Sequence, residues 1–353
     1  MSASREVLIT ARFFDTQAVE ALRARGLRIH TGGVAFDAVD PEITSDMHAA
    51  LESSSAWILG MAPVSRELLE RYPRLQIVAR RGVGFDTVDA AAIKDLGRVL
   101  TITPGCNEPT VADHTVGLML TVGKHFHESH RRMQAGEKAV VVGTELHGKT
   151  VGLIGLGRIA RLVARRLQGF DVRLLAYDPF PDERLAKEAG AEYASLEEVL
   201  RQSDVVSLHA PLSDGTRHLL DVRTIGMMKP GAILVNTARG ELVDDAALLD
   251  ALKAGKLGGA GLDVLGSEKD PSLEGITREL LALPNVVCTQ HTGGSSREGL
   301  ARANMLAAQC VMSALDNGLM PSGCVVADGR PPLIHPACPG RPCTRPTTQE
   351  TSQ

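Results

Sequence analysis

The stretch Val151-Gly-Leu-Ile-Gly-Leu-Gly-Arg-Ile-Ala160 decides the fold of this chain. Its first four residues, Val151–Ile154, are a short apolar run typical of a buried strand. The next six have the form G-x-G-x-x-A, and a helical pattern runs from Ile159 to about Gln168. We therefore predict a strand, a tight turn and a helix, which together make the first βα unit of a parallel sheet.

The spacing of small residues in this turn suits a phosphate group. Gly155 permits the tight turn, Gly157 lets the backbone approach a pyrophosphate, and Ala160 is small enough for the helix to pack on the strand. The helix N-terminus offers free N–H groups and the positive end of the helix dipole to an anion. The turn therefore predicts a dinucleotide site.

An acidic residue selects between the two nicotinamide dinucleotides. The next predicted strand ends at Asp178, about 20 residues downstream, where a carboxylate hydrogen-bonds the ribose hydroxyls. That carboxylate repels a 2′-phosphate, and the following Pro179-Phe180-Pro181 supplies no Arg to receive one. We expect NAD rather than NADP.

Short apolar runs alternate with helical patterns along most of the chain, which favours an α/β fold with parallel sheets. Before residue 102 we predict strands at Val7–Thr10, Ala56–Leu59, Gln76–Ala79 and Val99–Thr101. From residue 150 we predict strands at Val151–Ile154, Val172–Tyr177, Val205–Leu208, Ile233–Asn236, Gly261–Val264 and Val286–Cys288. The clearest helix signals are Gln17–Arg25, a start at Asn107, a capping box of Ser195 and Glu198, and Ser296–Asp316. His125–Leu146 is more polar, so we predict a connecting segment there.

Composition narrows the functional class. The 353 residues carry a net charge of -4, which gives no reason to expect a nucleic-acid partner. No apolar run reaches the length of a bilayer span, and the N-terminus shows no secretory signal, so we expect no membrane partner. The six cysteines are scattered without a CxxC pair, which favours reduced thiols, a cytoplasmic location and no metal site.

Polar side chains follow three further predicted strands. Arg239 lies just past one strand end, Asp263 and Glu268 lie at and beyond a second, and His291 follows a third. In an open α/β sheet the ligand binds at the carboxyl ends of the strands. We therefore expect these side chains to converge on the dinucleotide crevice.

Seven ordered motifs give the chain a specific resemblance to the D-isomer-specific 2-hydroxyacid dehydrogenase family, from about Leu75 to Pro321. They are RRGVGFDTVD (80–89), TPGCNEPTVADHT (103–115), VGLIGLGRIA (151–160), LHAPL (208–212), VNTARGELVD (235–244), GLDVLGSE (261–268) and QHTGG (290–294). The resemblance implies two doubly wound parallel-sheet domains. A Rossmann NAD-binding domain (102–289) would be inserted into a flavodoxin-like substrate domain (1–101 and 290–327), and a Pro-rich tail (328–353) would be disordered.

The resemblance also implies a catalytic trio, whose chemistry the residue types can perform. Arg239 would hold the substrate carboxylate with its two-pronged guanidinium. His291 would protonate the carbonyl oxygen as hydride reaches C2, and act as base in the reverse direction. Glu268 would orient the imidazole ring and favour its protonated form.

Further roles follow from the resemblance. Arg158 and Ile159 would lie on the pyrophosphate, and Pro211 and Thr216 match the adenosine-side loop. Thr237 and Ala238 match cofactor contacts, and Asp263 matches the group that anchors the nicotinamide carboxamide. The loop Gly82-Val83-Gly84 would meet the substrate carboxylate through its backbone N–H groups. Either Arg81 or Arg80, just before the loop, could reach a second anionic group on the substrate or simply be a solvated charge.

Some loop positions depart from the family pattern and leave the substrate open. Gln290 and Thr292 flank His291 where Pro and an apolar residue are usual, and Lys269-Asp270 replaces a common Pro. Two substrate pairs remain: 3-phosphoglycerate/3-phosphohydroxypyruvate, and glyoxylate or hydroxypyruvate with their reduced forms. An NADH-responsive binding module of the corepressor type is the alternative to an enzyme. The resemblance also implies a homodimer formed through the two long helices at the domain junction.

Overall fold

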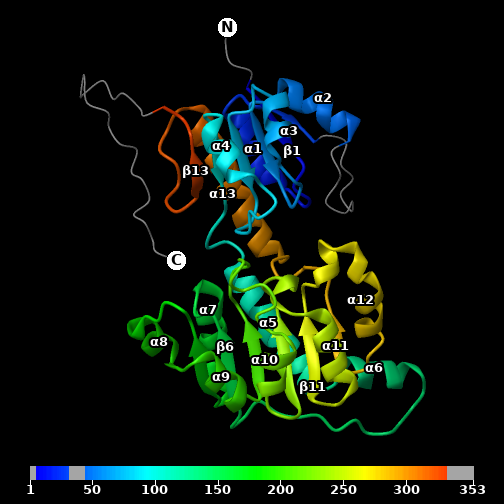
Figure 1. The fold of residues 1–353 in the computed structure, drawn as a ribbon. Coiled ribbons are helices and arrows are strands. Elements are labelled where there is room, and N and C mark those ends of the chain that lie inside the picture. The colour runs from blue at the N-terminus through cyan, green and yellow to red at the C-terminus, as the bar shows by residue number, and fades with distance from the viewer. Residues whose placement is uncertain (1–4, 32–43, 332–353) are drawn as a thin grey trace. The chain divides into compact units, whose positions relative to one another are not determined.

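The chain folds into two compact units (Figure 1). The computed structural model describes residues 5–31 and 44–331. Unit 1 contains the described residues of 1–107 and 296–353, and unit 2 contains residues 108–295. Each unit has its own sheet with an apolar cluster on either face, so each has a separate core.

Unit 2 is built on a seven-stranded parallel sheet. Its strands are β6 (Thr150–Ile154), β7 (Arg173–Tyr177), β8 (Ala191–Tyr193), β9 (Val205–Leu208), β10 (Ala232–Asn236), β11 (Leu257–Leu262) and β12 (Val286–Cys288). They lie in the order β12-β11-β10-β9-β6-β7-β8, with every pairing parallel. This is the doubly wound Rossmann order extended by one strand, and the order reverses between β6 and β9. The predicted dinucleotide turn therefore leaves the sheet at the place where such folds bind ligands.

Helices cover both faces of the unit 2 sheet because successive strand residues point to opposite sides. The helices are α5 (Glu108–Gly123), α6 (Phe126–Gln134), α7 (Arg158–Leu167), α8 (Glu183–Ala189), α9 (Leu196–Gln202), α10 (Val222–Met227), α11 (Asp245–Lys253) and α12 (Glu274–Leu281). Leu153 and Ala176 pack with α5, α7 and α8, whereas Ile154 and Leu175 pack with α9 to α12. Short 3-10 turns complete the loops: η1 (Gln168–Phe170), η2 (Gly240–Leu242), η3 (Gly266–Glu268) and η4 (Pro271–Leu273).

Unit 1 has a six-stranded sheet in the order β13-β5-β4-β3-β1-β2. The strands are β1 (Glu6–Ile9), β2 (Arg28–His30), β3 (Ala56–Leu59), β4 (Ile77–Arg80), β5 (Val99–Thr101) and β13 (Val325–Asp328). The first five are parallel in the flavodoxin-like order 2-1-3-4-5, and β13 adds an antiparallel edge. Helices α1 (Thr16–Ala24) and α13 (Arg297–Leu315) pack on one face. Helices α2 (Ser45–Ser53), α3 (Arg66–Arg71) and α4 (Ala90–Asp95) pack on the other.

The predicted fold class is confirmed, with corrections to some elements. β11 runs from Leu257 to Leu262 rather than Gly261–Val264, because its pairing with β10 ends at Asn236 and Leu262. The segment His125–Leu146 is more than a connection, since it contains α6. Edge strands β2, β8 and β13 were not predicted. The Ser195–Glu198 capping box is present, and Ser296 caps α13.

The units divide the chain six residues later than the sequence suggests, at 107/108 rather than 101/102 and at 295/296 rather than 289/290. The start of the predicted tail is folded: Asp328 pairs with Val99 on β5, and Arg330 forms an ion pair with Asp328 at 2.7 Å. The rest of the predicted disordered tail lies outside the described residues. No helix in the described ranges is long and apolar enough to cross a membrane.

Candidate active site

The turn after β6 has the tight backbone conformation that its glycines predict. Gly155 has φ +90°, and a Cβ there would lie 3.0 Å from the His209 backbone, so no side chain fits. Gly157 is the N-cap of α7, and a Cβ on it would meet no atom within 4 Å. Arg158 and Ile159 form the first turn of α7, and the Arg158 guanidinium lies 3.8 Å from a Glu108 oxygen. The start of α7 therefore presents backbone N–H groups on an open side, which fits a pyrophosphate.

Asp178 stands at the end of β7 beside this turn. Its carboxylate accepts hydrogen bonds from the backbone N–H groups of Leu156 (2.9 Å) and Phe180 (3.0 Å). The first of these bonds joins the acidic residue directly to the glycine turn. An acid in this place fits the ribose of NAD, as the sequence predicts.

The loop after β9 is closed by one side chain. The Thr216 hydroxyl donates to the Pro211 carbonyl oxygen (2.7 Å) and accepts from the Ser213 backbone N–H (2.8 Å). Thr237 differs, because its hydroxyl is buried and lies 2.9 Å from that of Thr115 on α5. Thr237 can therefore offer a cofactor only its backbone in this conformation, while the Ala238 N–H is already bonded to the Asn236 side chain (3.0 Å).

Arg239 follows β10 in a short, tightly held loop. The Asn236 side-chain amide donates to the Arg239 carbonyl oxygen (2.8 Å), and Arg239 Nη1 donates to the Ala238 carbonyl oxygen (2.7 Å). The next residue, Gly240, packs against the loop that carries Glu268. A Cβ on Gly240 would lie 2.2 Å from the Leu265 carbonyl carbon, so only glycine allows the two loops to meet.

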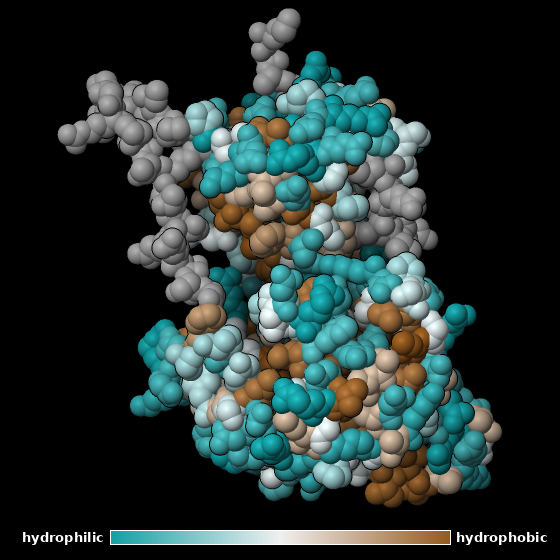
Figure 2. All heavy atoms as spheres, viewed as in Figure 1, coloured by the Kyte–Doolittle hydropathy of each residue, from teal (hydrophilic) through white to brown (hydrophobic). Residues whose placement is uncertain are grey.

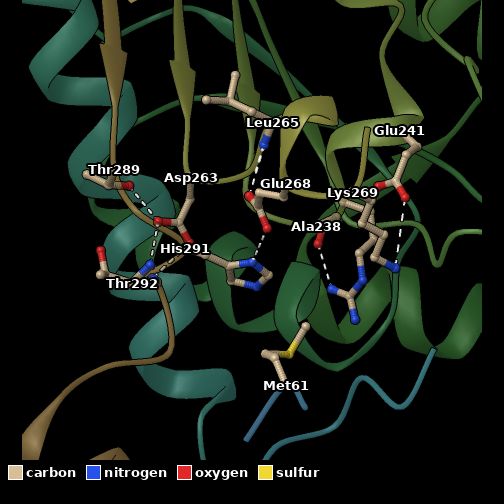
Figure 3. Close-up of polar contacts among 12 residues, drawn as sticks. Met61, Ala238, Glu241, Asp263, Leu265, Glu268, Lys269, Thr289, His291 and Thr292 are labelled. Atoms are coloured by element: carbon tan, nitrogen blue, oxygen red, sulfur yellow. Dashed lines mark hydrogen bonds and ion pairs between the residues drawn. The ribbon is translucent and has the colours of Figure 1, made fainter. Parts of the chain in front are cut away.

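Glu268 and His291 are in direct contact (Figure 3). Glu268 Oε1 accepts from the Leu265 backbone N–H (3.0 Å), and Glu268 Oε2 lies 2.8 Å from His291 Nδ1. Both side chains keep more than a third of their surface exposed, at 39% and 36%. The carboxylate thus fixes the imidazole ring through Nδ1, and Nε2 is the nitrogen left for a reactant.

The backbone of His291 is held in an unusual conformation. Its φ is +52°, in the left-handed region that side-chain-bearing residues rarely adopt, and its N–H donates to the Asp263 carbonyl oxygen (2.9 Å). Such a conformation persists only where surrounding contacts enforce it, and it is common at functional sites.

Those contacts come from Asp263, whose side chain is buried beneath the His291 loop. It accepts from the Thr289 hydroxyl (2.5 Å) and from the backbone N–H groups of Thr292 and Gly293 (2.8 Å each). His114 on α5 joins through Nε2, 2.9 Å from the Thr289 hydroxyl and 3.4 Å from Asp263. Burial raises the pKa of Asp263, but these hydrogen bonds outweigh it and hold the pKa below its usual value. In this conformation the contacts of Asp263 hold the loop.

The predicted substrate loop lies in unit 1. Gly82 exchanges hydrogen bonds with Thr103, as donor to its hydroxyl (2.8 Å) and as acceptor from its N–H (2.9 Å), which anchors the segment Gly82-Val83-Gly84. The Arg80 side chain is buried, donating to the Arg81 carbonyl oxygen and to Met61 Sδ. Arg81 is half-buried.

Sequence reasoning missed Asp245, His114 and Thr289 as parts of this site. Asp245, the first residue of α11, is buried and accepts from the Gly266 backbone N–H (3.1 Å). No motif singles it out, since an acid at the start of a helix is ordinary. His114 lies within the TPGCNEPTVADHT motif, which was the available signal.

Comparison with known proteins places the chain in a family. Residues 116–293 match the model of the "D-isomer specific 2-hydroxyacid dehydrogenase, NAD binding domain". The chain belongs to this family. A hydroxypyruvate reductase of Thermotoga maritima is 40% identical over 244 residues, 69% of this chain and 78% of that protein. A D-3-phosphoglycerate dehydrogenase of Mycobacterium leprae is 36% identical over 82% of this chain but only 54% of its own length.

A solved structure agrees with the sequence comparison. The D-lactate dehydrogenase of Aquifex aeolicus, crystallised with NAD and lactic acid, superposes with a TM-score of 0.78 at 30% identity, covering 92% of this chain and 99% of that one. The chain is therefore an NAD-dependent oxidoreductase that interconverts D-2-hydroxy acids and 2-keto acids, as the sequence predicts. These relatives are enzymes, which favours the enzyme over the binding-module alternative.

Proposed function

We propose that Arg239, Glu268 and His291 carry the reaction, with Arg239 holding the substrate carboxylate and His291 acting as acid and base. The observation that supports this most directly is the 2.8 Å contact between His291 Nδ1 and Glu268 Oε2. It orients the ring so that Nε2 can donate a proton to a carbonyl oxygen. Arg239 offers a planar, permanently charged group of the kind that binds carboxylates in two-pronged fashion.

The residues of unit 2 that would hold NAD are the glycine turn, Asp178 and the loops after β9 and β10. We propose direct contacts for Gly155, Gly157, Arg158, Ile159, Asp178, Pro211, Thr216, Ala238 and the Thr237 backbone. Bound NADH supplies the hydride for C2 of the keto acid. His291 supplies the proton for the oxygen in the same reduction, and takes it back when the hydroxy acid is oxidised.

For the substrate we propose a small unphosphorylated keto acid, hydroxypyruvate or glyoxylate, in preference to 3-phosphohydroxypyruvate. The Arg80 guanidinium donates to the Arg81 carbonyl oxygen in its own loop and to Met61 Sδ in the loop after β3. The similarity of the chain to a hydroxypyruvate reductase over most of that protein's length also supports this choice. In unit 1, the loop Gly82-Val83-Gly84 would also contact the substrate carboxylate through its backbone N–H groups.

The proposal is tested by following NADH oxidation with hydroxypyruvate, glyoxylate, 3-phosphohydroxypyruvate and pyruvate. We expect turnover with the first two, and a loss of kcat of about 100-fold or more in His291→Gln with NADH binding retained. His147→Gln, at an exposed histidine of the same unit, is the matched control and should behave as wild type. Wild-type protein that binds NADH and reduces none of the four acids would refute the enzyme proposal.

Arg81→Ala separates the two substrate classes. If an anionic group of the substrate reaches this side chain, kcat/KM falls selectively for 3-phosphohydroxypyruvate, and the phosphorylated substrate is favoured. An equal and small effect on all acids supports the unphosphorylated class.

We also propose that the enzyme is a cytoplasmic homodimer. Its four described cysteines are free thiols, as expected of a reducing compartment. α6 and the segment after it expose four large apolar side chains: Phe126, Met133, Val140 and Val142. Figure 2 shows apolar surface at the end of unit 2 that carries this segment. These residues, rather than long helices alone, would then form the subunit contact. Light scattering tests this: a dimer mass that falls to a monomer in Val140→Glu/Val142→Glu supports it, and a wild-type monomer refutes it.

A further inference from the structure

A second buried carboxylate, Asp245, lies behind the loops that carry the acid–base pair. It occupies the first position of α11 with 6% of its surface exposed. Its Oδ2 accepts a hydrogen bond of 3.1 Å from the backbone N–H of Gly266, and a Cβ on Gly266 would lie only 2.9 Å from that oxygen. The carboxylate and the Gly266 backbone are therefore in close contact.

The turn that Asp245 holds is the one that positions Glu268. Gly266 begins η3, which ends at Glu268, and the preceding Leu265 N–H donates to Glu268 Oε1. The other oxygen of Glu268 contacts His291 Nδ1. A chain of contacts thus leads from Asp245 through one short turn to the imidazole. The same turn packs against Gly240, the residue next to Arg239.

The surroundings of Asp245 make its charge costly. Asp244, the N-cap of α11, and Glu241 from η2 repel a negative charge and raise the pKa of Asp245, and His218 before α10 acts in the opposite direction. Lys269, just after η3, forms an ion pair with Glu241 at 3.9 Å. Cys288 on β12 also faces the carboxylate. Burial is the dominant effect and raises the pKa of Asp245 to about 6.

A neutral residue at this position would support the fold as well as an acid does. Asn has the same shape and can accept the Gly266 hydrogen bond without the cost of a buried charge. Only the ionised carboxylate, however, makes the stronger, charge-assisted bond to the turn.

We propose that Asp245 is a positioning residue for the reaction: its carboxylate holds the Leu265–Glu268 turn in the conformation that presents Glu268 to His291, and protonation loosens that hold. This rests on the proposed roles of Glu268 and His291. It makes the ionised form of Asp245 the active one, so kcat for keto-acid reduction falls on the acid side as Asp245 is protonated.

The test is the pH dependence of kcat and KM for hydroxypyruvate reduction in wild type, Asp245→Asn, Asp245→Ala and a control. We expect the acid limb near pH 6 to be present in wild type and absent in Asp245→Asn, which keeps the acceptor oxygen but does not titrate. Asp245→Ala, which leaves the Gly266 N–H without this acceptor, should lower kcat about 10-fold with KM for NADH unchanged. Asp221→Asn is the control, because Asp221 caps α10 in the same unit and Asn caps equally well.

The outcomes separate this inference from the proposed function. An acid limb unchanged in Asp245→Asn, or a wild-type kcat in Asp245→Ala, overturns the role of Asp245 while the enzyme proposal stands. A wild type without turnover overturns the enzyme proposal itself. If Asp245→Ala fails to fold, as shown by circular dichroism, the isosteric Asn variant still decides the matter through its pH profile.

Discussion

Two buried carboxylates support the two catalytic loops, and their environments shift their pKa values in opposite directions. Asp263 accepts hydrogen bonds from the Thr289 hydroxyl and two backbone N–H groups, and its pKa lies below the usual value. Asp245 accepts one backbone N–H and has a raised pKa. The difference follows from the neighbours. His114 and the hydrogen-bond donors stabilise the charge of Asp263 against the cost of burial, whereas Asp244 and Glu241 add repulsion at Asp245. Asp263 therefore remains ionised at neutral pH, whereas Asp245 titrates near it.

We predict that Asp245→Asn stabilises the protein at neutral pH. Because the folded pKa of about 6 lies above the ordinary 3.8, the stability associated with Asp245 is complete below about pH 4 and is lost as pH rises through 6. Relative to wild type, the variant should gain about 2 kcal/mol in free energy of unfolding between pH 4.5 and pH 7.5. Urea unfolding at the two values measures this. Asp250→Asn, on the exposed side of the same helix, should show a constant difference, and a constant difference for Asp245→Asn would contradict the prediction.

We predict that Asp263→Asn, in contrast, destabilises the protein at neutral pH. The lowered pKa means that the ionised side chain stabilises the fold above about pH 4, and that this stability is lost only as pH falls through the still lower folded value. An amide cannot accept on both sides, so we predict a loss of about 3 kcal/mol in free energy of unfolding at neutral pH.

The same variant distinguishes two roles for Asp263. Displacement of the His291 loop should lower kcat about 100-fold with little change in Kd for NADH. A rise in Kd that accounts for the lost activity would instead support contact with the nicotinamide carboxamide, as the family resemblance implies. NADH fluorescence titration alongside steady-state kinetics measures both, and Asp270→Asn, at an exposed residue after η3, serves as the control.

Sequence reasoning works best for residues in fixed motifs at strand ends. Glu268 and His291 could be identified together because parallel strands deliver their carboxyl-end residues to one edge. Asp245 and Thr289 could not, because their importance depends on which backbone N–H or side chain lies opposite them. Thr237 shows the same limit, since its hydroxyl turns inward to Thr115.

At the scale of elements, most strands were predicted, and three of the four edge strands, β2, β8 and β13, were missed. β9 and β12 have the predicted bounds, and β6 and β10 each begin one residue early. Strands β2 and β8 have three residues each at the edges of their sheets, where most side chains are half-buried or exposed and the apolar pattern fades. The helix α6 was missed because its sequence is strongly polar.

The β6–α7 turn gives a prediction at this scale. Gly155→Ala forces a Cβ into the left-handed region and to within 3.0 Å of the His209 and Ala210 backbone, so we expect a loss of about 2 kcal/mol and weaker NADH binding. Gly226→Ala is the control. Gly226 lies in α10 without a positive φ, and a Cβ there meets nothing within 4 Å, so this substitution should stabilise slightly. Thermal unfolding and NADH titration measure both; an equally tolerated Gly155→Ala would show that the turn is not held as described.

On the scale of the whole molecule, we expect cofactor binding to stabilise one unit and not the other. Each of the four apolar clusters in the described residues draws its members from a single unit. The predicted dinucleotide contacts all lie in unit 2, within residues 155–263. Separate cores allow separate unfolding, and a ligand stabilises only the state that binds it.

Calorimetry with and without NADH tests this division. We expect two unfolding transitions, of which NADH at about 100 times its Kd raises one, by an amount equivalent to about 2.7 kcal/mol. Asp178→Ala, which removes the acidic contact at the end of β7, should abolish that shift and leave the other transition in place. A single transition that moves as a whole would mean that the units unfold together in spite of their separate cores. In that case the NADH-induced shift would report on the entire chain, and every stability difference predicted above for unit 2 would apply to both units at once.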